Sequence, residues 1–194
     1  MFALPVGLPG LIALALGILA FFASLFVAGR RRAGEQGSRR DGGSWGWIAL
    51  QGVAIGFAGF GPIHVALAPF SAVALAQATG VALLIGGAVA LFVWASRTMG
   101  AEWAIVARTR ADARLVTAGP FAYVRNPIYV ALGLFMLAMA LAYGHPGQLL
   151  LAVPLYAFAT SRRVHSEEKL LLAAFGADYA DYRARVPRFV PRLA

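Results

Sequence analysis

An Arg-Asn-Pro tripeptide at residues 125–127 stands directly before an apolar stretch that carries no charge as far as Gly144. Asparagine caps free N–H groups at helix starts, and proline is tolerated at the first helical position because its missing N–H would be unpaired there. The pattern therefore predicts a helix start beside the Arg125 guanidinium, and such a start binds anions. The simpler alternative is that Arg125 anchors a membrane helix at the lipid headgroups and Asn126 only caps it.

A pair of adjacent acidic residues, Glu167 and Glu168, is the second candidate for chemistry. Arg163 and Glu167 are four residues apart, so on a helix they share a face and can form an ion pair. Glu168 lies about 100° around the helix from Glu167, so the two carboxylates cannot do the same job. We expect one to face a pocket and the other to contact a loop. A solvated amphipathic face is the alternative for this segment.

The composition is that of a membrane protein. The 194 residues are 60% hydrophobic and 13% charged, and the absence of cysteine excludes disulfides, thiol nucleophiles and thiolate metal sites. The net charge of +9 arises in three charged blocks, at residues 30–44, 97–125 and from 162 onward. By the positive-inside rule each block is cytoplasmic, which favours a basic membrane-facing side over nucleic acid binding. No metal site is expected.

Five apolar segments alternate with these blocks or are joined by uncharged turns. They are residues 11–29, 45–70, 73–95, 127–143 and 147–160. The first would span about 28 Å as a helix, enough for a bilayer core. The last two are short and are joined by "GHPG". We therefore expect an all-α polytopic membrane protein of about five transmembrane helices, the last two a short hairpin, with the N-terminus outside and the C-terminus cytoplasmic.

Two features of residues 45–70 yield smaller predictions. Gly52 and Gly56 form a GxxxG pattern, which indicates close helix packing. His64 is expected to hydrogen-bond a carbonyl that Pro62 leaves free. A turn is expected near residues 68–71.

The C-terminal segment differs in character from the apolar ones. Its spacing predicts a helix from Arg162 to about residue 175, a stop at Gly176 and a second short helical piece that contains Tyr179 and Tyr182. Both pieces are amphipathic and are expected to lie in the cytoplasm, outside the spans.

"LVTAGPFAYVRNPIY" at 115–129, followed by "EEKLLLAAFGADYADYRARVPRFVP" at 167–191, resembles the isoprenylcysteine carboxyl methyltransferase family and the related bacterial integral-membrane and phospholipid methyltransferases. The shared pattern is a Gly-Pro-aromatic turn, an Arg-His/Asn-Pro-x-Tyr box, a Glu-Glu pair, Phe-Gly-x-x-Tyr-x-x-Tyr and a terminal Val-Pro. The likeness covers roughly the last 80 residues, and two ordered motifs are more specific than either alone. The first half is similar only as apolar spans.

The resemblance implies an S-adenosylmethionine-dependent methyltransferase without a Rossmann domain, whose lipophilic acceptor enters from the bilayer. Together with the apolar segments, it divides the chain into three spans at 1–96 and a cofactor-binding catalytic region at 97–194. It implies catalytic roles for Glu167 and for Arg163, which would orient the acceptor or stabilise charge. It implies cofactor contacts for Leu115, Val116, Thr117, Gly119, Tyr123, Arg125, Asn126, Pro127, Tyr129, Glu167 and Glu168. Asn126 replaces a histidine often found in the box, and its amide cannot titrate.

The cofactor's charges suit these residues. Its carboxylate suits Arg125 and the helix start, its ammonium and ribose hydroxyls suit the glutamates, and its sulfonium suits the aromatic faces of Tyr123 or Tyr129.

Two other functions stay open. Sterol-reductase-like membrane enzymes, which use NADPH, share an Arg-x-Pro-x-Tyr box, but they usually have more spans and an acidic residue soon after the box, where this chain has "IYVALGLF". A small non-enzymatic membrane protein would bind no nucleoside cofactor. The basic side chains are almost all arginine, which hints at a GC-rich bacterial source and therefore at the bacterial inner membrane.

Overall fold

The computed structural model describes residues 3–30, 44–100 and 114–191, and within these ranges the chain is all-helical, as predicted. Five α-helices follow one another in the order α1 (Leu8–Arg30), α2 (Ser44–Ala58), α3 (Ala72–Met99), α4 (Pro127–Ala142) and α5 (Leu149–Arg185). Two short 3-10 turns, η2 (Gly119–Ala122) and η3 (Pro146–Gln148), precede α4 and α5.

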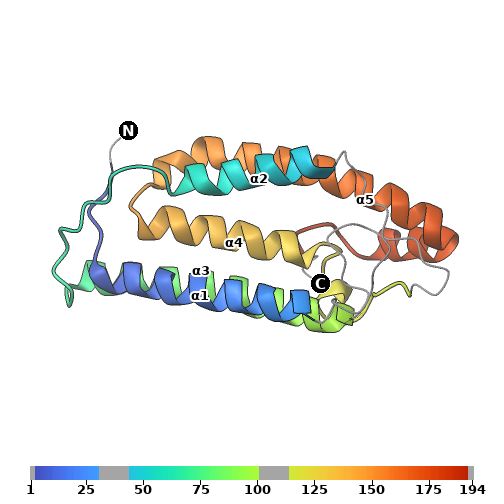
Figure 1. Cartoon of the computed structure of the whole chain (residues 1–194), viewed down its shortest axis with the longest axis horizontal. Coiled ribbons are helices and arrows are strands. Elements are labelled where there is room, and N and C mark those ends of the chain that lie inside the picture. Colours follow the sequence, from blue (N-terminus) through green and yellow to red (C-terminus); the bar gives the residue numbers. More distant parts are fainter. Residues whose placement is uncertain (1–2, 31–43, 101–113, 192–194) are drawn as a thin grey trace.

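The helices run alternately up and down one bundle (Figure 1). The ends of α1 and α3 and the starts of α2 and α4 lie together on the right of Figure 1, at the end from which the second half of α5 projects. Arg30 and Arg97 lie in the last turns of α1 and α3 there. We call this the basic end. The structure thus brings the described parts of the three charged blocks to one side, as the charge pattern predicts.

Two of the helices, α1 and α3, are long and apolar enough to cross a membrane by length and composition. The helices α2 and α4 are apolar but have only 15 and 16 residues. Large apolar side chains point outward along α1, where Leu16 and Leu19 are 63% and 67% exposed. An apolar outer surface of this kind fits contact with lipid.

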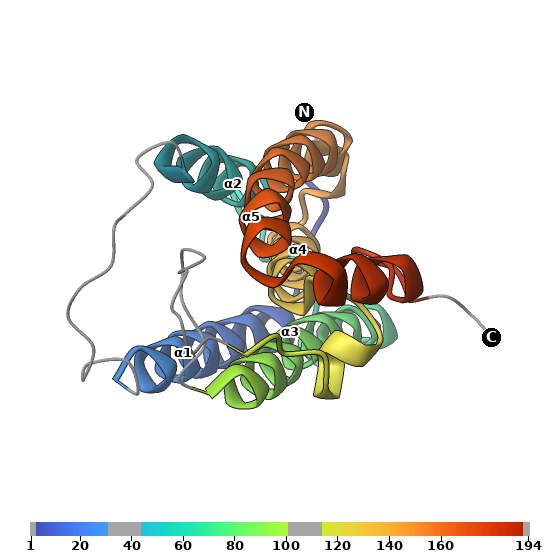
Figure 2. The same ribbon diagram turned by 90° about the vertical axis from the view of Figure 1, so that its right-hand side faces the viewer.

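The central helix is α4, which packs on two separate groups of neighbours (Figures 1 and 2). On one side its Phe135 ring lies 5.1 Å from Phe21 of α1, which in turn lies 4.9 Å from Phe92 of α3. On the other side its Met136 and Ala140 join an apolar cluster with residues of α2 and α5. Because α4 begins with the Arg-Asn-Pro box, this double packing fixes the box at the basic end.

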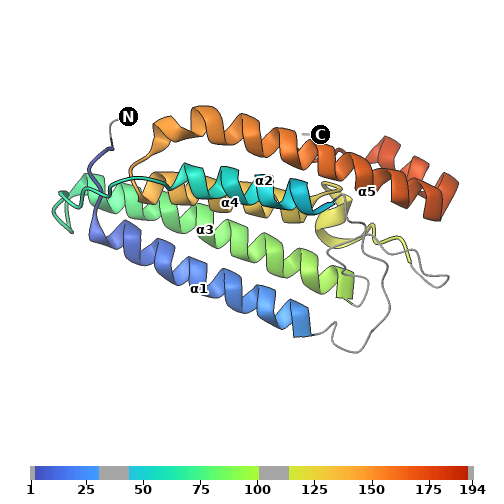
Figure 3. The same ribbon diagram turned by 45° about the horizontal axis from the view of Figure 1, so that its top comes forward.

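The helix boundaries differ from the prediction in two places. Helix α2 ends at Ala58, so the turn predicted at 68–71 is the last part of a longer connection at 59–71. Helix α5 runs without a break through residues 160–162, so the last apolar segment and the C-terminal segment are one helix (Figure 3). Nothing in this stretch breaks a helix, and the Arg163–Glu167 pair supports it. The predicted stop at Gly176 is a kink with φ 52°.

Two predictions about residues 45–70 are wrong. Gly52 and Gly56 face away from the bundle, and no described atom lies within 4 Å of the position that a Cβ would take on either, so neither serves helix packing within the described chain. His64 is exposed and does not serve a carbonyl that Pro62 leaves unpaired; the ring near this proline is that of His145, whose Nε2 lies 3.0 Å from the Pro62 carbonyl oxygen. His64 is nearer to Pro62 in the sequence. In the fold, however, the connection at 59–71 packs against η3, where the buried His145 lies beside Pro62.

Candidate functional site

Helix α4 starts as predicted, with Pro127 at its first position and Asn126 as the preceding residue. The predicted side-chain cap is wrong, because the Asn126 amide does not accept a hydrogen bond from the helix. It donates to the Arg188 carbonyl at 3.3 Å, and the Asn126 backbone N–H donates to the same oxygen at 3.1 Å. The backbone N–H of Arg125 donates to the Pro187 carbonyl at 2.8 Å. The box therefore binds the C-terminal tail along its backbone.

The Arg125 guanidinium also contacts the tail. Its Nη1 donates to the carbonyls of Arg183, at 2.9 Å, and of Val186, and its Nη2 donates to Oε1 of Glu168 at 2.8 Å. The last carbonyls of a helix have no partner within the helix, and α5 ends at Arg185. Arg125 therefore caps the end of α5. The negative end of the helix dipole lies there and favours a cation.

Glu168 lies between two arginines. Arg188 donates to it from Nε, at 3.0 Å, and from Nη2, while Arg125 contacts it from the other side. The Glu168 side chain is 5% exposed and that of Arg125 8%. Burial alone would raise the pKa of Glu168, but the hydrogen bonds from Arg188 and Arg125 outweigh burial and hold the pKa below its ordinary value. We call Arg125, Glu168 and Arg188 the tail cluster.

A lowered pKa makes the tail cluster sensitive to acid. A carboxyl group whose pKa is lower in the folded state stabilises the fold at every pH above its unfolded pKa, and this contribution is lost as the pH falls through the folded pKa. The unfolding temperature in detergent should therefore fall as the pH is lowered below about 4.5. A Glu168→Gln variant should lose much of this acid dependence, which thermal scans from pH 6 to pH 3.5 would measure. An unchanged dependence in the variant would assign it to other groups.

Glu167 points to a different set of partners. Its Oε1 accepts hydrogen bonds from Nε of Arg163, at 3.0 Å, and from the hydroxyl of Tyr129, at 2.7 Å. The Arg163 guanidinium also lies 5.4 Å from the Tyr129 ring centre, a cation–π distance. Burial raises the pKa of Glu167. We call Tyr129, Arg163 and Glu167 the inner cluster. The two adjacent glutamates thus serve separate clusters, as their spacing predicts.

One buried polar residue beside the inner cluster was missed by the sequence reasoning. Gln51 of α2 is 3% exposed, its Oε1 accepts from Nη1 of Arg163 at 3.4 Å, and its Nε2 donates to Thr160 at 2.8 Å. The sequence could have indicated Gln51, because it is the one amide side chain in the apolar stretch "WIALQGVAIG". Polar residues in such apolar stretches are rare and usually have a functional partner.

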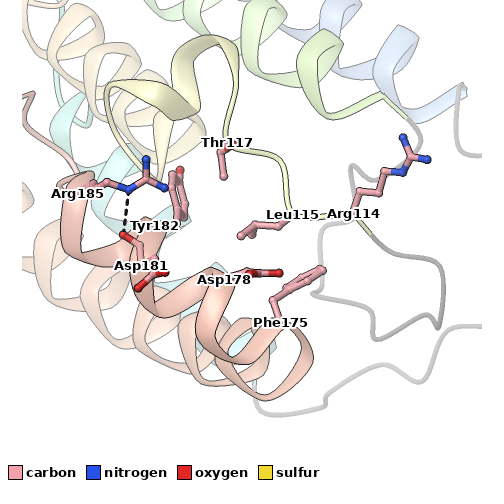
Figure 4. A pocket seen from close by; sticks show the side chains of 8 residues that line it. All are labelled: Arg114, Leu115, Thr117, Phe175, Asp178, Asp181, Tyr182 and Arg185. Atoms are coloured by element: carbon pink, nitrogen blue, oxygen red, sulfur yellow. Dashed lines mark hydrogen bonds between the residues drawn. The ribbon is translucent and has the colours of Figure 1, made fainter.

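A cavity of about 490 Å³ opens between the start of the 114–118 segment and the kinked end of α5 (Figure 4). Leu115 and Thr117 line one side, and Phe175 and Asp178 face them from α5. The remaining lining residues are Arg114, Asp181, Tyr182 and Arg185. Of the predicted cofactor residues, Leu115 and Thr117 line this cavity. The tail cluster and the inner cluster do not.

The remaining predicted residues lie around the turn before α4. Gly119 has φ 60°, and a Cβ there would lie 2.6 Å from Oγ1 of Thr98, so the turn requires glycine. Tyr123 is 61% exposed and its ring lies 6.2 Å from that of Trp94. Tyr123 therefore rests on α3, whereas Tyr129 belongs to the inner cluster, so the two aromatic faces lie in different places. Val116 is half-buried and Pro127 buried.

The predicted site residues thus fall into three places that α5 connects. Of these, Arg163 and Glu167 belong to the inner cluster, Glu168 to the tail cluster, and Leu115 and Thr117 to the cavity, which Phe175, Asp178, Asp181, Tyr182 and Arg185 of α5 also line. Helix α5, with 37 residues, therefore contributes side chains to the inner cluster, to the tail cluster and to the wall of the cavity.

Comparison with known proteins points to one family. The family model described as phospholipid methyltransferase matches residues 70–178, more than half of the chain. The chain is 35% identical over 90 residues to the protein-S-isoprenylcysteine O-methyltransferase of Schizosaccharomyces pombe, covering 46% of this chain and 38% of that protein. It is 37% identical over 101 residues to the cobalt-zinc-cadmium resistance protein CzcN of Cupriavidus metallidurans, covering 50% and 45%.

A third relative is the protein-S-isoprenylcysteine O-methyltransferase of Tribolium castaneum, 32% identical over 84 residues that cover 41% of this chain and 28% of that protein. The matches span less than half the length of each of these relatives. The matched residues 70–178 contain η2, the Arg-Asn-Pro box and both glutamates. The chain belongs to the phospholipid methyltransferase family, and its matched part is similar to isoprenylcysteine O-methyltransferases.

Proposed function

We propose that the protein is an integral-membrane, S-adenosylmethionine-dependent methyltransferase that acts on a lipophilic acceptor at the cytoplasmic face. The observation that carries the proposal is the cavity at the basic end, which is lined by residues from both motifs of the methyltransferase likeness. Family membership supports the reaction class, and the apolar surface of the bundle supports the membrane setting.

The cavity has the chemistry that this cofactor needs. Asp178 and Asp181 suit its ammonium group and ribose hydroxyls, and Arg185 suits its carboxylate. Phe175 and Tyr182 offer aromatic faces to the adenine and the sulfonium. When bound, the cofactor supplies an electrophilic methyl group. Arg125 and Glu168, which are also predicted contacts, would hold the tail in the position that closes this cavity.

The inner cluster is the proposed acceptor side. It lies at the basic end of the packed cluster formed by α2, α4 and α5, so an oily chain could lie in the bilayer along exposed apolar side chains of α2 and α5, such as Val53 and Phe158, while its reactive group meets Arg163. Arg163 would orient that group or stabilise its charge. Glu167, whose pKa burial raises, can accept a proton from an acceptor that arrives protonated. The protein must also align the acceptor atom with the methyl group of the cofactor and exclude water from the site.

The proposed topology has five membrane helices, with the N-terminus outside and the basic end in the cytoplasm. The alternating directions of α1 to α5 and the charges at the basic end support it (Figure 1). The first three helices would form the span region of residues 1–96, and residues 97–194 the catalytic region. The part of α5 beyond Arg162, including the piece after Gly176, would lie on the inner surface of a bacterial plasma membrane.

Binding of S-adenosylhomocysteine by the purified protein in detergent tests the proposal, with NADPH as the comparison. Tight binding of S-adenosylhomocysteine and none of NADPH is the expected result. The opposite result would favour a reductase of the sterol-reductase type, and binding of neither would favour a non-enzymatic protein. Transfer of labelled methyl groups into lipid extracts, into phosphatidylethanolamine vesicles and into an S-isoprenylated cysteine would then identify the acceptor.

An Asp178→Ala variant should bind S-adenosylhomocysteine about tenfold more weakly, a loss of about 1.4 kcal/mol. Asp178 is an exposed carboxylate that lines the cavity, so its removal takes away a partner for the ligand's ammonium or ribose without disturbing a buried contact. Calorimetric titration measures the change, and the exposed Lys169→Ala variant is the control. Equal affinity in Asp178→Ala and the wild type would exclude this cavity as the cofactor site.

A further inference from the structure

Gln51 lies in the part of the chain that the family model leaves unmatched, since the match begins at residue 70. It is a polar side chain in the middle of the apolar helix α2, and 3% of it is exposed. A buried amide costs free energy unless both of its ends are hydrogen-bonded, and in a membrane helix water offers no substitute.

Both ends of the Gln51 amide have partners, and both partners are on α5. Nε2 donates to Oγ1 of Thr160 at 2.8 Å, and Oε1 accepts from Nη1 of Arg163 at 3.4 Å. The contact with Arg163 fixes the orientation of the amide, because a guanidinium can only donate and therefore requires Oε1, which leaves Nε2 to donate to the Thr160 hydroxyl. The amide therefore faces Arg163 in one orientation only.

Arg163 is held from two further directions. Its Nε donates to Glu167 at 3.0 Å, and the guanidinium lies over the Tyr129 ring of α4. Arg163 is 9% exposed, so its guanidinium is held by side chains rather than by bulk water. Glu167 and Tyr129 come from α5 and α4. Gln51 adds a contact from α2 to this guanidinium.

We propose that Gln51 is a positioning residue, which holds the Arg163 guanidinium in place for the acceptor and thereby makes α2 part of the active site. The inference rests on the proposed function, in which Arg163 meets the acceptor. It extends that function to a helix that the resemblance does not include. Because Gln51 acts through Arg163, its loss affects methyl transfer more than cofactor binding.

A Gln51→Met variant tests the proposal, since methionine has a similar length and removes both hydrogen bonds. Its matched control is Gln77→Met in α3. Gln77 is also a glutamine in a membrane helix with both amide ends bonded, to the Gly7 N–H at 2.9 Å and the Leu141 carbonyl at 3.0 Å, but it contacts no part of the candidate site. Gln51→Glu is the conservative variant, because a carboxylate accepts from Arg163 and from the Thr160 hydroxyl.

The first measurement needs no acceptor. Phenylglyoxal modifies accessible guanidinium groups, and mass spectrometry of the Arg163 peptide gives the rate of modification at this residue. Gln51→Met should raise this rate at least fivefold, while Gln77→Met and Gln51→Glu should leave it within twofold of the wild type. Equal rates in Gln51→Met and the wild type would show that Gln51 does not hold Arg163, and would overturn the proposal whatever the enzyme does.

The second measurement is methyl transfer from labelled S-adenosylmethionine to the better of two probes, phosphatidylethanolamine vesicles and an S-isoprenylated cysteine. Gln51→Met should lower kcat at least tenfold with S-adenosylhomocysteine affinity within twofold, and Gln51→Glu should recover at least half of the wild-type kcat. A normal kcat in Gln51→Met would overturn the proposal while leaving the methyltransferase assignment intact. A wild-type protein that binds no S-adenosylhomocysteine would instead overturn the proposed function. The rate of phenylglyoxal modification would then still show whether Gln51 holds Arg163 in place.

Discussion

Replacing Glu168 with alanine should destabilise the protein by about 3 kcal/mol and weaken S-adenosylhomocysteine binding at least tenfold. The carboxylate pairs with Arg125 and Arg188, and its removal leaves the mostly buried Arg125 guanidinium without its counter-ion. Breaking a buried ion pair costs about 3–5 kcal/mol, and we take the lower value because Arg188 is 35% exposed.

The loss of affinity follows from what the tail cluster holds. Arg125 caps the end of α5, and that end carries Asp181, Tyr182 and Arg185, which line the cavity. A tail that is released from Glu168 no longer fixes these side chains, so the ligand must pay the cost of ordering them. Thermal unfolding in detergent and calorimetric titration measure the two effects. Limited trypsin digestion should also cut faster at Arg183 and Arg185.

Two further variants make the result decisive. Lys169→Ala changes the next residue on α5, which is exposed, and should leave both quantities unchanged. Glu168→Gln keeps an acceptor for Arg125 but removes the charge, so it should show an intermediate loss. If Glu168→Ala unfolds at the wild-type temperature but still binds the ligand weakly, Glu168 contacts the cofactor directly, as the resemblance predicts. Loss of stability with normal affinity would make the cluster purely structural.

The sequence predicts the helices well because their signals are local. The five apolar helices, Pro127 at a helix start and the break in helical geometry at Gly176 are all read from neighbouring residues, although α2 ends well before residue 70 and α5 continues past residue 160. The separate directions of Glu167 and Glu168 are also a local property, since they follow from the helical angle per residue alone.

The partners of these residues are not local, and the sequence reasoning missed most of them. Arg125 meets Arg183 and Val186 across 58 and 61 positions, and Gln51 meets Arg163 across 112. We expected the helix start at Asn126 to be capped by the Asn126 side chain and to bind an anion. In the structure it donates hydrogen bonds to backbone carbonyls of the tail, and because every residue has such a carbonyl, the sequence does not show which ones will be used. Side-chain type predicts which chemistry a residue can do, and only the packing of α4 between two groups of helices decides which residues meet.

Replacing Arg163 with alanine should lower methyl transfer at least a hundredfold while S-adenosylhomocysteine affinity stays within threefold of the wild type. Arg163 does not line the cavity that we assign to the cofactor, so the cofactor keeps its contacts. The acceptor side loses its cation. Removing one group that stabilises developing charge in a water-excluded site typically costs about 10²–10³ in kcat. Glu167 also loses the ion pair with Arg163, which lowers its pKa against the effect of burial.

The neighbouring Arg162→Ala is the matched control, because Arg162 is exposed and its guanidinium lies 5.6 Å from the Trp47 ring, away from Glu167. It removes the same charge from the same helix, so any general effect of net charge on membrane insertion appears in both variants. Arg163→Lys keeps the charge but cannot donate to Glu167 and Gln51 with the same planar geometry, and it should recover only part of the rate. An Arg163→Ala enzyme with a normal rate would place the acceptor outside the inner cluster. Any negative charge that the acceptor carries or develops in that cluster is stabilised by the Arg163 guanidinium, so the loss of this cation must slow the reaction there.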